Sequence, residues 1–192
     1  PARASESARK GLSMGATNAI VITDPALAGA DAMVTSEVLA KVISEGGYDF
    51  VISGVESTDA RMSVIPAMVS ARLKHAQLTF ANKVVVDEGA KKISINRVTD
   101  SGEIEMEASF PAVISVLEKI NEPRYPSFKG IMAAKKKEII TKDLAAIGGA
   151  DSASWTEVLD AIAKPPRSAG LKIEDDGTAA QKLVDFLVER KL

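Results

Sequence analysis

The chain has 192 residues, 46% hydrophobic and 26% charged, a composition typical of a globular protein. It has no cysteine and a single histidine, His75, which excludes disulfides, thiolate metal sites, iron–sulfur clusters and sites built from several histidines. The formal net charge of -2 favours neither nucleic acid nor a membrane surface. No run approaches the roughly 18 apolar residues of a membrane helix, and the first residues do not form a signal peptide. We therefore expect a cytoplasmic protein that is not itself in the membrane and binds no nucleic acid.

The first part of the chain alternates helices and strands. The patterns predict buried strands over residues 19–23 and 50–54, and helices over 2–15, 36–45 and 61–74. Strands and helices that alternate through short connections imply a parallel sheet covered by helices. Because such a sheet usually opens with a strand, we expect that opening βα units of roughly 60 residues are missing here.

The middle of the chain predicts antiparallel strands. Residues 83–86 and 93–98 form two strands joined by the hairpin turn Asp87-Glu-Gly-Ala90. The run over 103–110 alternates between glutamates and apolar residues, which indicates a strand with one face in water. The largely apolar segment Ala112-Val-Ile-Ser-Val116 predicts a fully buried strand. The expected fold is α/β, with an open, mainly parallel sheet, flanking helices and a small antiparallel meander.

The last residues predict an extended arm. Ser154-Trp-Thr-Glu157 has the pattern of a capping box that opens a short helix through Ile162. An extended connector over 165–170 leads to an amphipathic helix over 179–192, and Trp155 is expected to anchor the arm. This region is too broken to build its own core. We divide the chain into an α/β domain, 1–145, and a C-terminal arm, 146–192, that packs on a partner.

The loop after the strand over 50–54 is the first candidate site. Ligands of open parallel sheets bind outside the carboxyl ends of the strands, where helix N-termini offer free amides to anions. Gly54 allows a ligand to approach the backbone, and Ser57, Thr58 and Asp59 supply short polar side chains. The same three residues could simply turn the chain and cap the next helix. The glycine spacings of a P-loop or a Rossmann fingerprint do not occur, so both roles stay open.

The segment from Asn121 to Lys137 is the second candidate site. It places apolar side chains on a proline-stiffened segment with lysines around them, an arrangement suited to an acidic partner surface. Alternatively, the apolar residues pack inward and the lysines are merely solvated. No catalytic set emerges, since His75 is placed as a helix cap or surface residue and the glutamates at 103, 105 and 107 share one environment.

The residues of this second segment resemble one protein family. Asn-Glu-Pro-Arg-Tyr-Pro at 121–126, followed by Ile131-Met132 and the lysines at 135–137, resembles the beta subunit of the electron transfer flavoproteins. The resemblance extends over the whole chain, including Arg9-Lys-Gly-Leu-Ser-Met-Gly-Ala16, the hairpin at 97–102 with Pro111-Ala-Val-Ile, and Pro165-Pro-Arg-Ser-Ala-Gly170.

The resemblance implies a fold, cofactors and partners. The fold would be similar to that of the adenine nucleotide alpha hydrolases, in a heterodimer whose alpha subunit holds most of the FAD site while the beta subunit binds AMP. The FAD would carry electrons from acyl-CoA dehydrogenases of fatty acid oxidation, and from similar flavoenzymes, to a membrane quinone reductase and so to the respiratory chain. The chain would then be an electron carrier subunit and not an enzyme.

The resemblance also assigns residues. AMP would contact the loop that consists of Gly54, Val55, Glu56, Ser57, Thr58, Asp59, Ala60, Arg61, Met62, Ser63, Val64 and Ile65. Residues 116–138 would form a recognition loop with Phe128 as its apolar anchor. The docking residues would be Tyr125, Phe128, Lys129, Ile131, Met132, Lys135 and Lys136.

Some positions depart from the family pattern. Many members have an acidic run and Asn-Gln-Thr-Gly where this chain has Asp59-Ala-Arg-Met-Ser-Val-Ile-Pro66, so the backbone must hold more of the phosphate. Val98 replaces an acidic residue that often follows the arginine of the hairpin. The loop leaves open a bifurcating type with a second FAD in place of AMP. A regulatory or hydrolytic α/β protein that binds AMP or ATP is a further alternative.

Overall fold

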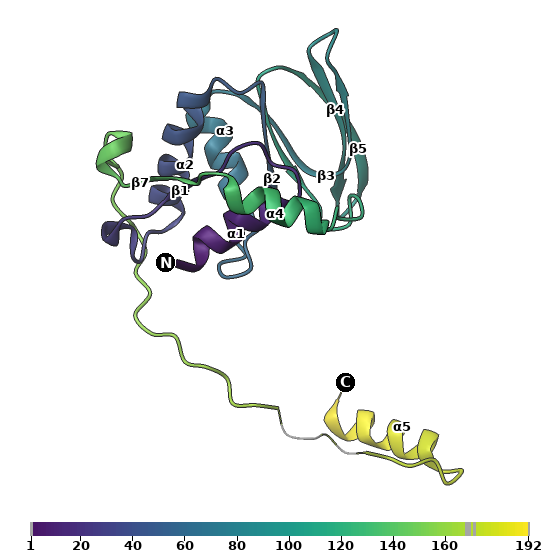
Figure 1. Cartoon of the computed structure of the whole chain (residues 1–192). Coiled ribbons are helices and arrows are strands. Elements are labelled where there is room, and N and C mark those ends of the chain that lie inside the picture. Colours follow the sequence, from purple (N-terminus) through teal and green to yellow (C-terminus); the bar gives the residue numbers. More distant parts are fainter. Residues whose placement is uncertain (1, 168–169, 171, 192) are drawn as a thin grey trace. The chain divides into compact units, whose positions relative to one another are not determined.

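The computed structural model describes residues 2–167, 170 and 172–191 (Figure 1). The chain divides into two compact units after Val158. The first unit contains every strand that the described residues form. Among its described residues, the second contains one helix.

A five-stranded sheet forms the centre of the first unit. Its strand order is β2-β6-β3-β4-β5, with β2, β6 and the first part of β3 parallel, and β3, β4 and β5 antiparallel. The predicted α/β fold with a parallel part and a hairpin meander is confirmed (Figure 1). The strands are β2 Phe50–Gly54, β3 Ala76–Asp87, β4 Lys92–Thr99, β5 Gly102–Ser109 and β6 Ala112–Val116.

Strand β3 begins seven residues before the predicted start at residue 83. Its first residues pair with β6, and the register then shifts between Leu78 and Ala81. At this irregularity Phe80 has a φ of 62°, and its amide donates a hydrogen bond to Ser115 Oγ at 3.0 Å. Sequence periodicity missed this part because the polar Thr79, buried here, breaks the apolar run.

The main core cluster is built from strand residues, and a helix also packs against the sheet. Helix α3 (Ile65–Leu73) packs against β3 and β6, and α2 (Ala32–Gly46) packs against α3. Helix α2 begins earlier than predicted because Asp31 caps it, and α3 begins later than predicted because the preceding loop contains residues with positive φ. The main core cluster consists of Leu78, Ala81, Ile93, Ile95, Ala112 and Ile114.

Two strands predicted to be fully buried are not. Strand β1 (Ile20–Ile22) pairs only with β7 (Ile140–Lys142), a strand that the sequence analysis missed, and Ile20 is 38% exposed. Strand β2 lies at the edge of the main sheet, so Ile52 is 56% exposed. Both strands are edge strands among the described residues, and an edge strand has one side without a neighbouring strand.

The remaining elements of the first unit are short helices. Helix α1 (Ala2–Ser13) agrees with the prediction and packs against α4 (Phe128–Lys136), as Figure 1 shows. Two 3-10 turns flank the small sheet, η1 (Pro25–Leu27) and η2 (Ala145–Ile147). Ile147 packs with Val34 and Val38 of α2 in a second core cluster.

The predicted helix over 154–162 does not form, and the amides of Trp155 and Thr156 donate hydrogen bonds to the side chain of Asp31, the N-cap residue of α2. The second unit contains α5 (Ala179–Arg190), which agrees with the predicted amphipathic helix. Residues 168, 169 and 171, within or next to the expected connector, lie outside the described residues. Among the described helices, none combines the length and apolar character needed to cross a membrane.

Candidate functional site

A cavity of about 550 Å³ lies at the carboxyl end of β2. The loop between β2 and α3 lines it on one side, and the start of α2 with the loop before it lines it on another. Thr156 and Val158 also contribute to the lining. This is the end of a parallel sheet where ligands bind in open α/β folds, as the sequence analysis expected.

The structure gathers most of the predicted nucleotide-binding residues around this cavity. The lining includes Gly54, Val55, Glu56, Ser57, Asp59, Ala60, Met62, Ser63 and Ile65, whereas Thr58, Arg61 and Val64 are not part of it. Sequence reasoning missed the residues from outside the loop. They are Gly29, Ala30, Asp31, Ala32, Thr35, Leu39, Ser53, Pro66, Thr156 and Val158. Asp31 precedes an apolar helix and fits the pattern of an N-cap residue, but no local pattern predicts that Thr156 or Val158 lines the cavity.

The start of α3 lies in the lining of the cavity. Ser63 has a φ of 55°, and Val64, the N-cap residue, follows in the right-handed helical region. Successive residues of opposite hand turn their amides toward one concavity, which binds anions. Among the described residues, no side chain caps this helix, so its first amides lack a side-chain acceptor.

The side chains of the cavity are acidic. Those that carry a charge are Asp31, Glu56 and Asp59, and the described lining includes no basic residue. Glu56 Oε2 accepts a hydrogen bond from Ser63 Oγ at 3.1 Å. A hydrogen bond from the Ser57 side chain, together with the Ala60 amide, lowers the pKa of Asp59. Carboxylates accept hydrogen bonds from hydroxyls and amines but repel an anion. An anionic group in this cavity would therefore bind to backbone amides.

The start of α2, in contrast, is closed by Asp31. Its Oδ1 accepts hydrogen bonds from the amides of Met33 at 2.9 Å and Val34 at 3.2 Å. Its Oδ2 accepts from the amides of Trp155 at 2.7 Å and Thr156 at 3.3 Å. The Trp155 amide is the largest cause of the lowered pKa of Asp31. Within this chain the Trp155 backbone holds the segment, while the residue is 82% exposed, so its expected role as an anchor of the arm stays a prediction.

Glu37 holds the same segment from further along α2. It is 5% exposed, and its carboxylate accepts hydrogen bonds from the amides of Asp151 at 2.7 Å and Ser152 at 2.8 Å. Lys41 lies 3.1 Å away and Arg72 of α3 lies 3.9 Å away. Burial opposes ionisation, but the hydrogen bonds from Ser152, Asp151 and Lys41 outweigh it and lower the pKa to about 2. Residues 151–156, here called the strap, are thus fixed to α2 by two carboxylates.

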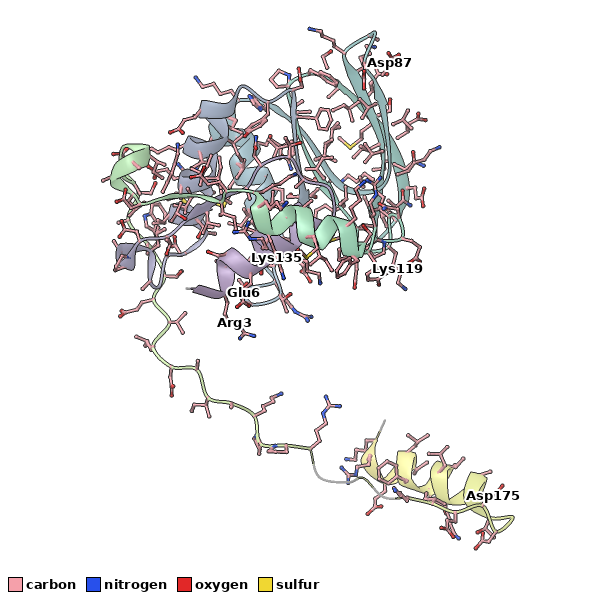
Figure 2. The ribbon with its side chains drawn as sticks, viewed as in Figure 1. Arg3, Glu6, Asp87, Lys119, Lys135 and Asp175 are labelled. Carbon is pink, nitrogen blue, oxygen red and sulfur yellow. The ribbon has the colours of Figure 1, made fainter. Side chains whose placement is uncertain are left out.

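The second half of the predicted docking segment forms helix α4, while residues 121–127 form no helix or strand. Ser127 Oγ accepts a hydrogen bond from the Gly130 amide at 3.1 Å and caps α4. One face of α4, here called the docking stripe, is exposed. Phe128, at 80%, is the most exposed of its apolar members, and Figure 2 labels Lys135 on the same helix. The docking stripe consists of Phe128, Ile131, Met132 and Lys135 at helical spacing, with Tyr125, Lys129 and Lys136 exposed beside it.

Comparison with known proteins identifies the family. A family model described as the electron transfer flavoprotein domain matches residues 1–147. The electron transfer flavoprotein subunit beta of Mycobacterium tuberculosis is 45% identical over 199 residues, which cover 100% of this chain and 74% of the relative. The chain belongs to the electron transfer flavoprotein beta subunits.

More distant members of the electron transfer flavoprotein beta subunits agree. The protein of that name from Mycobacterium leprae is 44% identical, with the same coverage. That from Megasphaera elsdenii is 32% identical over 204 residues, covering 99% of this chain and 74% of the relative. Members of this family are electron transfer proteins and not classical enzymes. The family match at residues 1–147 contains the cavity loop, α1 and α4.

Proposed function

We propose that the chain pairs with an electron transfer flavoprotein alpha subunit and binds AMP in the cavity beside β2. The complex accepts electrons from acyl-CoA dehydrogenases and similar flavoenzymes on an FAD held mainly by the alpha subunit. It then passes them to a membrane quinone reductase and so to the respiratory chain. In this role the chain supplies a nucleotide site and a docking surface, while the flavin carries out the redox chemistry.

The observation that carries the nucleotide assignment is the uncapped start of α3 at the wall of the cavity. The amides of that helix start suit a phosphate group, because they combine the positive end of a helix with a concave backbone. The carboxylates of Glu56 and Asp59 suit the hydroxyls and the amine of a nucleoside. One loop thus offers acceptors for the neutral part of AMP and donors for its charged part.

The nucleotide assignment is tested by denaturing the native complex and measuring the small molecules that are released. One FAD and one AMP per heterodimer are expected. Two FAD molecules would replace the AMP assignment with the bifurcating type. Release of FAD without any second nucleotide would overturn the assignment of the cavity. The amount of heterodimer is obtained from the ratio of the two protein subunits in the same sample.

The docking assignment is supported by the docking stripe on α4. An aromatic anchor surrounded by smaller apolar side chains supplies contact energy, and a rim of lysines attracts an acidic partner and speeds its encounter. Phe128 lies in the first turn of the helix, and Lys135 and Lys136 lie in the last. The stripe is therefore apolar at one end and basic at the other.

Phe128→Ala tests the docking assignment. Loss of an anchor of this kind weakens binding by about tenfold or more. The apparent affinity of a dehydrogenase for the complex should fall by that factor, while AMP content and heterodimer assembly stay unchanged. Val85→Ala, a change at another exposed apolar residue on β3, serves as the control. Equal transfer rates in the Phe128→Ala variant and the wild type would overturn the docking role.

A further inference from the structure

Helix α4 is too short to be stable without tertiary contacts. It has nine residues, and isolated helices below about 12–15 residues are marginal in water. The shape of the docking stripe therefore depends on what holds α4 in place. Figure 1 shows α1 and α4 side by side, and the two helices are in contact.

Arg9 of α1 binds the carboxyl end of α4. Its Nη1 donates hydrogen bonds to the carbonyl oxygen of Ala134, at 2.7 Å, and to that of Lys137. These carbonyls belong to the last turn of α4 and its C-cap residue, where a helix leaves its acceptors without partners and carries a partial negative charge. Lys137 Nζ in turn donates to the carbonyl oxygen of Ala16 at 2.6 Å, just beyond α1.

A close contact sets the distance between the two helices. A Cβ atom at Gly130 would lie 2.6 Å from the carbonyl oxygen of Ser13, so only glycine fits here without a shift of the backbone. Ala134, one turn further on, is 1% exposed, and Leu12 of α1 is 3% exposed. Gly130 and Ala134 lie on the face of α4 opposite Phe128 and Met132, since residues two apart differ by about 200° around a helix.

We propose that Arg9 is a positioning residue for partner docking. By holding the last turn of α4 against α1, it keeps the helix formed and directs the docking stripe outward. Arg9 lies in the segment 9–16 and α4 in the segment 121–137, both of which resemble the family. The contact between Arg9 and α4 joins these two segments. The proposal rests on the docking function proposed above for α4, and Arg9 acts through the helix.

Amide hydrogen exchange in the full heterodimer tests the structural step. Arg9→Met should raise the exchange rates of the amides of α4 at least tenfold, because the helix opens locally more often. Arg9→Lys keeps the charge but loses the fork of donors, and should give an intermediate rate. The control is Arg3→Met, since Arg3 is exposed on the same helix (Figure 2) and its loss should change the rates less than twofold. Unchanged protection of α4 in Arg9→Met would overturn the proposal.

A double-mutant cycle with Phe128→Ala tests the functional step. If Arg9 acts only by placing the docking stripe, Arg9→Met should raise the KM of a dehydrogenase for the complex about as much as Phe128→Ala, with kcat unchanged. The double variant should be no worse than either single one. Independent, additive effects would overturn the proposal.

A second variant covers the case in which Arg9→Met does not fold. Gly130→Ala displaces α4 from Ser13 without touching Arg9, and should raise both the exchange rates of α4 and the KM. A Gly130→Ala variant with wild-type exchange and KM would overturn the proposal. If Phe128→Ala alone leaves transfer unchanged, the docking function fails, while the exchange result for Arg9 is still measured independently.

Discussion

The two helices that start beside the cavity differ in how their first amides are satisfied. Helix α2 is closed by the chain itself, because Asp31 binds the amides of Met33 and Val34 and also holds the strap. Helix α3 has no side-chain cap among the described residues and begins after Ser63 with a positive φ. Both starts lie in the same cavity lining.

This difference separates a structural helix start from one that is available to a ligand. A carboxylate at the start of α2 already supplies the negative charge that the helix favours, so a phosphate placed there would meet a like charge. At α3 the equivalent positions are Pro66, which has no amide hydrogen, and Ala67, and no side chain caps the helix there. A nucleotide should therefore place its phosphate at α3 and its neutral groups toward Asp31. Changes on the closed side should affect stability, and changes on the open side should affect nucleotide affinity.

The largest effect is expected from Glu37→Ala, on the closed side. This change leaves the amides of Asp151 and Ser152 and the side chain of Arg72 without their shared acceptor. Removing one partner from a buried charged network costs about 3 kcal/mol. Urea denaturation should show a lower midpoint with an unchanged slope, and AMP affinity should stay near that of the wild type. A loss of AMP affinity without a loss of stability would contradict the division between the two sides.

Acid should weaken the same network. The pKa of Glu37 is about 2 in the folded chain and 4.5 ordinarily, so the folded state favours the ionised form. Its contribution is complete above about pH 4.5 and is lost as the pH falls toward 2, amounting to at most about 3 kcal/mol. In Glu37→Gln this dependence is absent. The difference in unfolding free energy between the wild type and Glu37→Gln should shrink steadily from pH 5 to pH 2, and a constant difference would exclude ionised Glu37 as the cause.

The open side is tested at Ser63. Ser63→Val places a β-branched residue at a positive φ, which straightens the loop and turns the amides away. We expect AMP to bind about tenfold more weakly, as measured by calorimetry on the complex stripped of nucleotide. Ser63→Gly keeps the backbone shape and removes only the hydroxyl bonded to Glu56, so AMP affinity should change less than twofold. If the glycine variant lost as much AMP affinity as the valine variant, the Ser63 hydroxyl and not the backbone would be the group that binds AMP.

Much of the fold could be predicted because its signals are local. The strand Ala112–Val116 is apolar except for Ser115, and the hairpin between β3 and β4 has a turn sequence between alternating residues. The first residues of β3 and the strand β7 could not be predicted, because polar or short sequences form strands there only through pairing with distant partners. The helix expected over 154–162 does not form either, and its first residues are held instead by hydrogen bonds to Asp31, which is distant in the sequence.

Only one wall of the candidate site could be predicted from the sequence. The loop from Gly54 to Ile65 follows a strand, so its place at the end of the sheet follows from chain order. Thr156 and Val158 come from about 90 residues further along the chain. They reach the cavity through the hydrogen bonds of Asp31 and Glu37, and no sequence pattern describes such long-range contacts. The same limit concealed the contact between Arg9 and α4.

The smallest effects should come from Asp31, which serves both the helix and the strap. Asp31→Ser keeps an N-cap oxygen for α2 but loses the second oxygen that holds Trp155 and Thr156. We expect the melting temperature to fall by only about 1–2 °C, with faster amide exchange at residues 155 and 156, whereas Asp31→Ala should lower it by about 3–5 °C. The difference between the two variants measures the cap alone. Because Asp31 belongs to the closed side, AMP affinity should change less than twofold in both variants. Equal exchange in Asp31→Ser and the wild type would show that the strap is held by Glu37 alone.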